Sequence, residues 1–245
     1  MPDKKIVNLP AKNLPIVPLT KKEIHDASAA RLSLITKEFA NGFNFLKDYP
    51  ISVTFFGSAR YKEDDFYYQK ARSLAVRVVE DLGYPVFTGG GPGIMEGANR
   101  GAMEAGGQSF GLTIELPHEQ STNPYLTKHL DFYYFFSRKV CMTFSAEAFI
   151  FFPGGIGTMD EFFEILTLVQ TGKIEKSPII LVGVEFWSKM DEFLRQEILS
   201  RGLIDVEDVS LYTITDNEDQ IIDIIRNAPV KNNNSMEFPH TPSLD

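Results

Sequence analysis

The stretch FIFFPGGIGTMDEFFEIL, residues 149–166, joins an apolar run to a glycine-rich turn and then to a segment with regularly spaced apolar residues. The apolar run predicts a buried strand, and Phe162, Ile165 and Val169 fall on one stripe of a helix that begins near Gly157. Strand, turn and helix in this order are typical of a parallel sheet, whose ligands bind where its strands end. The stretch therefore indicates both the class of fold and the place of a candidate site.

The same alternation runs outward from this stretch over most of the chain. Such regular alternation indicates an α/β fold, a Rossmann-like, doubly wound parallel sheet with helices on both faces. We expect further strands at ISVTFFG, YPVFTGGG, QSFGLTI, DFYYFF, PIILVG and LYTITD. We expect further helices near residues 64–82, 93–105 and 187–200, one that opens near Ser137, and one that ends near Arg226.

Four segments are expected along the chain. Residues 1–19 contain four prolines and predict an extended arm. Residues 20–48 predict an N-terminal helical extension, in which Thr20 and Glu23 match a capping box. Residues 49–228 form the Rossmann-like domain, and the polar, asparagine-rich residues 229–245 predict a disordered tail.

The composition excludes several classes of function. The 245 residues are 43% hydrophobic and carry a formal net charge of -9, so we expect no non-specific binding to nucleic acid or to an acidic membrane surface. Cys141 is the single cysteine, and the four histidines show no metal-ligand spacing, so no disulfide framework and no metal site are expected. No apolar run approaches the ~20 residues that cross a bilayer, which predicts a soluble, cytoplasmic protein.

Three expected strands end in glycine-rich turns: GSAR at residues 57–60, GGGPGIMEGANRGA at 89–102 and PGGIGT at 153–158. The turns lack the Gly-Lys-Ser/Thr of a Walker A loop, and the first strand lacks the G-x-G-x-x-G of a dinucleotide site. Glycine allows close approach of backbone N–H groups to an anion at a helix start. The alternative, that these glycines only permit tight turns, stays open for any one loop.

Charged residues near these turns have two interpretations each. Thr158 and Glu161 match a capping box, yet Glu161 and Glu164 also share the helix face close to the glycines. Asp160 is expected to be a solvated acid in the first turn of that helix. Another helix is expected to take Ser137 as its N-cap.

That N-cap would put Arg138 and Lys139 in a first turn, where the helix dipole disfavours cations. They would hold an anion there, although Lys139 alone also fits a surface ion pair. Arg60 and Arg100 are weaker candidates of the same kind. The aromatic residues of DFYYFF and EFFEI are expected to be buried, or to supply one ring beside a base. Residues 115–130 form either a segment that covers the site or an ordinary surface loop.

Taken together, GSAR, GGGPGIMEGANRGA, the pair Arg138 and Lys139, and PGGIGTMDE at residues 153–161 resemble the LONELY GUY (LOG) family. Its motif PGGxGTxxE is matched at every fixed position, and the likeness extends from about residue 51 to residue 225. Some relatives carry the label "lysine decarboxylase", but nothing in the sequence suggests a pyridoxal phosphate lysine site.

The resemblance implies hydrolysis of the N-glycosidic bond of a nucleoside 5'-monophosphate, such as a cytokinin riboside monophosphate or AMP, to a free base and ribose 5-phosphate. It implies no metal or redox cofactor, and a homodimer or larger homo-oligomer. Arg138 and Glu161 correspond to the catalytic pair of the family. The expected positions for phosphate and ribose are Gly57, Ser58, Gly90, Gly91, Gly93, Lys139, Gly154, Gly155, Gly157, Thr158 and Glu164.

The sequence departs from the family at one informative position. Plant-type members commonly have tyrosine where this chain has Ile156, which leaves the base preference open. The division of roles between Arg138 and Glu161 is open as well. Two other functions are compatible with the same loops: a nucleotide or molybdenum-cofactor carrier without catalysis, and a nucleotide-sensing regulator.

Overall fold

The computed structural model describes residues 20–115 and 122–229, so the expected arm at 1–19 and the tail from residue 230 onward lie outside the described residues. The described residues divide into two units, with the boundary between residues 37 and 38. Helix α1 (Lys21–Leu46) begins in the first unit and ends in the second. Its expected capping box is confirmed, because Glu23 N donates to Thr20 Oγ1 at 3.2 Å and Thr20 N donates to Glu23 Oε2 at 2.8 Å.

The second unit contains a seven-stranded sheet in which every neighbouring pair is parallel, as predicted. The strands lie in the order β4-β3-β2-β1-β5-β6-β7. They are β1 (Ser52–Phe56), β2 (Val86–Thr88), β3 (Ser109–Ile114), β4 (Lys128–Phe132), β5 (Ala146–Phe151), β6 (Ile179–Leu181) and β7 (Tyr212–Ile214). Connections from β1 and from β5 run toward opposite edges, so the switch point of the topology lies between these two strands.

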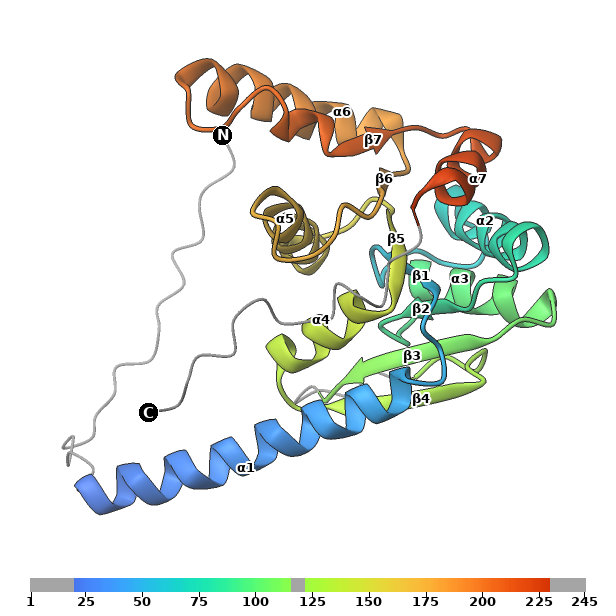
Figure 1. Ribbon diagram of the computed structural model, residues 1–245. Helices are drawn as coiled ribbons and strands as arrows, with labels where there is room; N and C mark the ends of the chain where they lie inside the picture. Colours follow the sequence, from blue (N-terminus) through green and yellow to red (C-terminus); the bar gives the residue numbers. More distant parts are fainter. Residues whose placement is uncertain (1–19, 116–121, 230–245) are drawn as a thin grey trace, which may run out of the picture. The chain divides into compact units, whose positions relative to one another are not determined.

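Helices cover both faces of this sheet (Figure 1). One apolar layer holds residues of α2 (Phe66–Leu82), α3 (Ile94–Glu104) and α7 (Glu218–Asn227). The other holds residues of α4 (Phe135–Phe144), α5 (Ile156–Gln170) and α6 (Val184–Phe193), together with Leu46 at the end of α1. The central strands β1 and β5 are buried throughout, which is why their sequences read as apolar runs rather than as alternating patterns.

Two expected element boundaries were wrong. The strand expected at DFYYFF lies earlier, because β4 pairs with β3 only as far as Ile114 and Phe132, and α4 begins at Phe135. Tyr133 and Phe135 are therefore 64% and 53% exposed instead of buried. The helix expected at 187–200 begins at Val184, ends at Phe193 and continues as a π-helical turn at Leu194–Ile198 and a 3₁₀ turn at Leu199–Arg201.

Candidate functional site

The three glycine-rich turns meet at the carboxyl edge of the sheet, because β2, β1 and β5 are neighbours. Ser58 links them through its backbone. Its N–H donates to the carbonyl of Pro153 at 3.1 Å, and its carbonyl accepts from Ile94 N at 3.0 Å. The first turn thus lies between the other two and is hydrogen bonded to both.

Helix α5 begins at Ile156, earlier than predicted, and its N-cap, Gly155, offers no side-chain hydrogen bond. The expected capping box of Thr158 and Glu161 is therefore wrong, since Thr158 lies inside the first turn and is buried. The first backbone bond of the helix runs from Met159 N to Gly155 O, which leaves the preceding N–H groups without helical partners. An uncapped helix start of this kind binds anions.

Arg138 and Glu161, the pair that the resemblance singles out, lie side by side at this edge. Arg138 Nη1 is 3.3 Å from Glu161 Oε1, and the two side chains are 7% and 16% exposed. Arg138 Nε also donates to the carbonyl of Leu112, within β3, at 2.6 Å. Its Nη2 lies so close to Gly89 that a Cβ at this position would overlap it. The guanidinium is therefore held from three directions.

Burial raises the pKa of the Glu161 carboxyl above its ordinary value, and the charge and hydrogen bond of Arg138 offset only part of that rise. A carboxyl whose pKa is shifted toward neutrality is suited to proton transfer and to stabilising a developing positive charge. The raised pKa thus agrees with a chemical role for Glu161, whereas the expected capping role would not have required a raised pKa.

Lys139 lies in the same cluster and contacts two carboxylates. Both carboxylates belong to α5: Lys139 Nζ is 2.7 Å from Glu164 and 3.1 Å from Asp160. Burial by itself lowers the pKa of Lys139, but the hydrogen bonds and charges of these carboxylates raise it above its ordinary value. A small pocket opens beside them between α4 and α5, lined by Phe56, Lys139, Met142, Thr143, Glu161, Glu164 and Ile165.

Helix α4 carries Arg138 and Lys139, but Ser137 is not its N-cap as predicted, because the helix begins two residues earlier at Phe135. Glu38 of α1 takes the capping role instead. Its carboxylate accepts from Tyr133 N at 2.6 Å, from Tyr134 N at 3.4 Å and from the Ser137 hydroxyl. The start of α4 is therefore occupied by a carboxylate of the protein, whereas within residues 20–115 and 122–229 no side chain caps the start of α5.

The glycines of the turns fall into three groups. Gly57 and Gly154 allow close packing, since a Cβ at Gly57 would lie 2.7 Å from the Ile94 side chain and one at Gly154 would overlap Thr158. Gly90 and Gly93 have φ of 70° and 71°, which other residues rarely adopt. A Cβ would meet open space at Gly155 and Gly157, which lie exposed at the start of α5.

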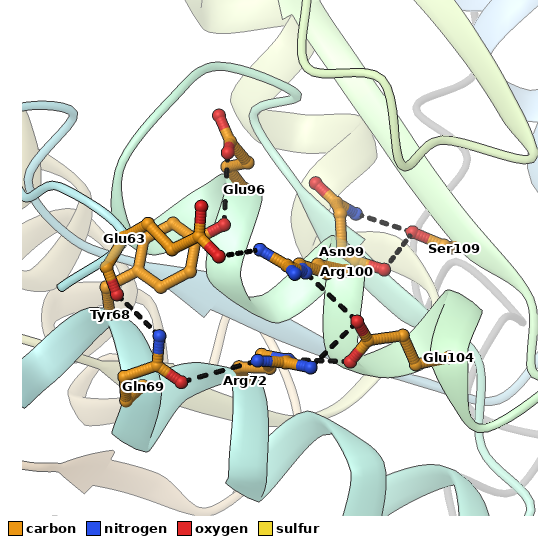
Figure 2. A network of polar contacts seen from close by, with 9 residues as sticks. All are labelled: Glu63, Tyr68, Gln69, Arg72, Glu96, Asn99, Arg100, Glu104 and Ser109. Carbon is orange, nitrogen blue, oxygen red and sulfur yellow. Dashed lines mark hydrogen bonds and ion pairs between the residues drawn. The ribbon is translucent and has the colours of Figure 1, made fainter.

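The two weaker arginine candidates are Arg60 and Arg100, and the carboxylates that pair with Arg100 differ from those that pair with Arg138 and Lys139. Figure 2 shows Arg100 between Glu63 and Glu104, and its Nη1 is 2.5 Å from Glu63 Oε1. Arg60 is exposed. Sequence reasoning missed Gly89, Asn123 and Glu38. Gly89 stood within the quoted glycine run, but the roles of the other two depend on contacts distant in the sequence.

Neither a group of metal ligands nor a helix able to span a membrane is present in residues 20–115 and 122–229, which the structure describes. None of their His, Cys, Asp and Glu side chains form a group of three or more that would hold a metal ion. None of the helices in these ranges is long and apolar enough to cross a membrane.

Comparison with known proteins gives one family and two curated relatives. A family model described as "Possible lysine decarboxylase" matches residues 95–225. The cytokinin riboside 5'-monophosphate phosphoribohydrolase of Rhodococcoides fascians is 28% identical over 152 residues, which are 59% of this chain and 74% of that protein. The enzyme of the same name from Arabidopsis thaliana is 28% identical over 134 residues, 54% of this chain and 62% of that protein.

Solved structures share the fold. The molybdenum cofactor binding protein of Rippkaea orientalis matches with a TM-score of 0.53 at 19% identity, over 73% of this chain and 96% of that one. The molybdenum cofactor carrier protein of Chlamydomonas reinhardtii matches with a TM-score of 0.51 at 20% identity, over 74% of this chain and 99% of that one. At these identities the likeness shows a common Rossmann-like architecture and nothing about the ligand.

Proposed function

The chain belongs to the LONELY GUY family, whose model is described as "Possible lysine decarboxylase", and we propose that it hydrolyses the N-glycosidic bond of a nucleoside 5'-monophosphate. The products would be a free base and ribose 5-phosphate. Two relatives named as phosphoribohydrolases support this reaction class.

The observation that carries the proposal is the uncapped start of α5 beside the buried pair of Arg138 and Glu161. The N–H groups at the helix start suit the phosphate of such a substrate. The carboxyl of Glu161, with its raised pKa, suits the glycosidic bond at the other end of the ribose. In our proposal the 5'-phosphate binds at the start of α5 and the turn at residues 89–93. The ribose then lies toward Glu161, and the base lies toward the pocket that Lys139 and Glu164 line.

The reaction breaks the bond between the anomeric carbon of the ribose and the base nitrogen. A water oxygen forms the new bond to that carbon and gives up one proton to the carboxylate of Glu161, while the base nitrogen takes a proton from solvent as it leaves. Positive charge develops on the sugar, as in other glycoside hydrolyses, and the carboxylate of Glu161 stabilises it and accepts the water proton. Its raised pKa places the acid limb of activity above the ordinary glutamate range.

Arg138 has a second role in this proposal. Its hydrogen bond to Leu112 O and its contact with Glu161 hold the guanidinium in place, so it can orient the carboxylate without moving during the reaction. Because it also lies against Gly89, it stands next to the turn assigned to the phosphate. We therefore assign Arg138 to orienting both the carboxylate and the phosphate end of the substrate.

The first experiment is a product assay on the purified chain. AMP, other nucleoside 5'-monophosphates and isopentenyladenosine monophosphate are incubated with the protein, and the free base is resolved by chromatography. Release of base from at least one of them, with adenosine as a poor substrate, is the expected result. Absence of product from all of them would overturn the proposal, and comparison of AMP with the prenylated nucleotide defines the base preference.

A second experiment separates catalysis from binding. Glu161→Gln should lower kcat by about 10²–10⁴-fold while nucleotide binding persists, because the amide retains the shape but not the charge. Asp160→Asn is the matched control, since it removes a carboxylate one residue away whose side chain is 57% exposed. A wild-type chain that binds nucleotide and releases no base would instead indicate a carrier or sensor.

We also propose a homodimer or larger assembly. Phe136, Val140 and Phe144 recur every four residues along α4 and are 45%, 42% and 37% exposed. An exposed apolar stripe of this kind commonly marks a contact between proteins. Light scattering of the wild type and of Val140→Glu tests this. The variant should have the smaller mass, and a monomeric wild type would exclude the assembly.

A further inference from the structure

Behind the turn at residues 89–93 lies a buried polar cluster that the proposed reaction does not use. Thr88, Asn99 and Ser109 are 0% exposed, and Asn123 is 6% exposed. Asn99 Nδ2 donates to Ser109 Oγ at 2.9 Å, and Thr88 Oγ1 donates to Asn99 Oδ1 at 2.6 Å. Buried polar groups with partners on several elements fix the elements relative to one another.

Asn123 connects this cluster to the glycine turn. Its backbone N donates to Gly90 O at 2.9 Å, and its Nδ2 donates to Gly91 O at 3.0 Å and to Asn99 Oδ1 at 2.9 Å. Its Oδ1 accepts from Tyr125 N at 3.1 Å. Both donor hydrogens of the amide are thus used, and the carbonyls of Gly90 and Gly91 both point toward Asn123.

The direction of the Gly90 carbonyl determines where the N–H group of Gly91 points, while the side-chain bond from Asn123 fixes the carbonyl of Gly91. A trans peptide is planar with its C=O and N–H opposed, so the Gly91 N–H points away from Asn123 when the Gly90 carbonyl points toward it. Within residues 20–115 and 122–229, the N–H groups of Gly91 and Gly93 donate to no protein atom, although both glycines are buried. N–H groups without a partner among these residues can donate to a bound anion.

The segment that carries Asn123 is held against α3 at a second point. Arg100, the residue after Asn99, lies over the ring of Tyr125 at 5.3 Å from its centre. Its guanidinium is fixed by Glu63 at 2.5 Å and by Glu104 at 3.0 Å. Adjacent residues of α3 therefore hold the segment on both sides of Pro124.

We propose that Asn123 is a positioning residue for phosphate recognition. Its side chain holds the carbonyl of Gly91, and with it the conformation of the turn at residues 89–93, so that the turn presents its N–H groups to the phosphomonoester of the substrate. The inference rests on the proposed function for the identity of the substrate, but its premise is a phosphate site at this turn. Removal of the side chain weakens phosphate binding and leaves the reacting groups in place.

The test compares Asn123→Ala with the wild type, using ribose 5-phosphate and inorganic phosphate as probes in calorimetry. Affinity for both should fall about 10- to 100-fold, the range for hydrogen bonds to a charged group. In the nucleotide assay, KM should rise by a similar factor while kcat changes less than about threefold. Asn123→Asp should behave like the alanine variant, because it cannot donate to Gly91 O.

Asn217→Ala is the matched control, because Asn217 caps α7 by accepting from Gln220 N at 3.1 Å. It should lose a similar amount of stability and keep the wild-type affinity for ribose 5-phosphate. If Asn123→Ala does not fold, Tyr125→Leu tests the same segment from its Arg100 side and should weaken binding in the same direction. Wild-type affinity in the folded Asn123 variants would overturn the inference.

The outcome can be separated from that of the proposed function. A wild-type chain that binds ribose 5-phosphate and releases no base from any nucleotide contradicts the hydrolase, while weaker binding by Asn123→Ala would still support the positioning role. A wild-type chain that binds neither probe overturns the positioning role. Hydrolysis with an unchanged KM in Asn123→Ala also overturns it and leaves the hydrolase in place.

Discussion

Gly89→Ala tests whether the position of Arg138 controls turnover. Gly89 follows β2, and its φ is not positive, so alanine introduces no backbone strain there. A Cβ at this position would overlap Arg138 Nη2 and would lie 2.8 Å from Met95 Sδ. To reach an ordinary contact near 3.5 Å, Nη2 must move by about 1 Å.

That movement has two expected effects, because the guanidinium is also bonded to Leu112 O at 2.6 Å and to Glu161 at 3.3 Å. Displacing a catalytic group by about 1 Å costs about 10²-fold in rate. As Arg138 moves away, it offsets less of the desolvation of Glu161, so the pKa of that carboxyl rises further. The acid limb of activity should therefore move to higher pH, and overpacking should cost about 1–3 kcal/mol of stability.

The assay is a pH profile of kcat for Gly89→Ala and for Gly106→Ala. Gly106 follows the far end of α3, has φ of 72° and would meet no atom within 4 Å, so its alanine variant is strained without crowding. It should lose about 1–2 kcal/mol of stability and keep the wild-type profile. If Gly89→Ala folds and retains both the wild-type kcat and the wild-type acid limb, Arg138 does not act through its position.

The pH dependence of stability, the start of α4 and the core each allow a further measurement. Burial raises the pKa of Glu161 in the folded protein above its pKa in the unfolded chain. The stability that the protonated carboxyl contributes is therefore full below the ordinary glutamate pKa and is lost as the pH rises through the pKa of the folded protein. Urea denaturation should therefore show Glu161→Gln gaining stability over wild type above about pH 4.3, by about 1.4 kcal/mol for each unit of elevation; a difference independent of pH would contradict the effect of burial. Glu38→Ala removes the acceptor for Ser137 and two N–H groups and should cost about 1–2 kcal/mol in the same assay, whereas an unchanged midpoint would mean that α4 is held otherwise. Phe162→Ala, whose ring is buried 5.6 Å from that of Trp187, should cost about 3–5 kcal/mol, and a loss below about 1 kcal/mol would mean that this part of the core repacks.

The order of the strands and helices could be predicted from sequence because apolar runs and helical stripes are local patterns. The glycine turns could be placed for the same reason, since glycine follows the expected strands at residues 57, 89 and 154. Parallel topology then brings these turns together. The pairing of Arg138 with Glu161 was suggested by the resemblance to the family, not by the order of the elements, and the structure places the two side chains in contact.

The starts of α4 and α5 could not be predicted, because both depend on contacts distant in the sequence. Ser137 has the chemistry of an N-cap, but Glu38 lies 99 positions away and occupies the start of α4. Thr158 and Glu161 have the spacing of a capping box, but Glu161 contacts Arg138 instead. Asn123 is 32 positions from Gly91, and no local pattern relates them. Local chemistry offers several partners to such residues, and the tertiary structure selects among them.

The charges at this edge of the sheet are already paired in the protein itself. Arg138 contacts Glu161, and Lys139 contacts Asp160 and Glu164, so two cations face three carboxylates. A phosphate dianion gains little net attraction from this cluster, and the N–H groups at the start of α5 and in the turn at residues 89–93 must supply most of its hydrogen bonds. Backbone N–H groups do not titrate, whereas Glu161 does. Apart from Arg138, which serves both ends of the substrate, phosphate binding therefore depends mainly on backbone N–H groups and cleavage on the carboxylate of Glu161. Substitutions at Asn123 and at Glu161 should for this reason separate KM from kcat.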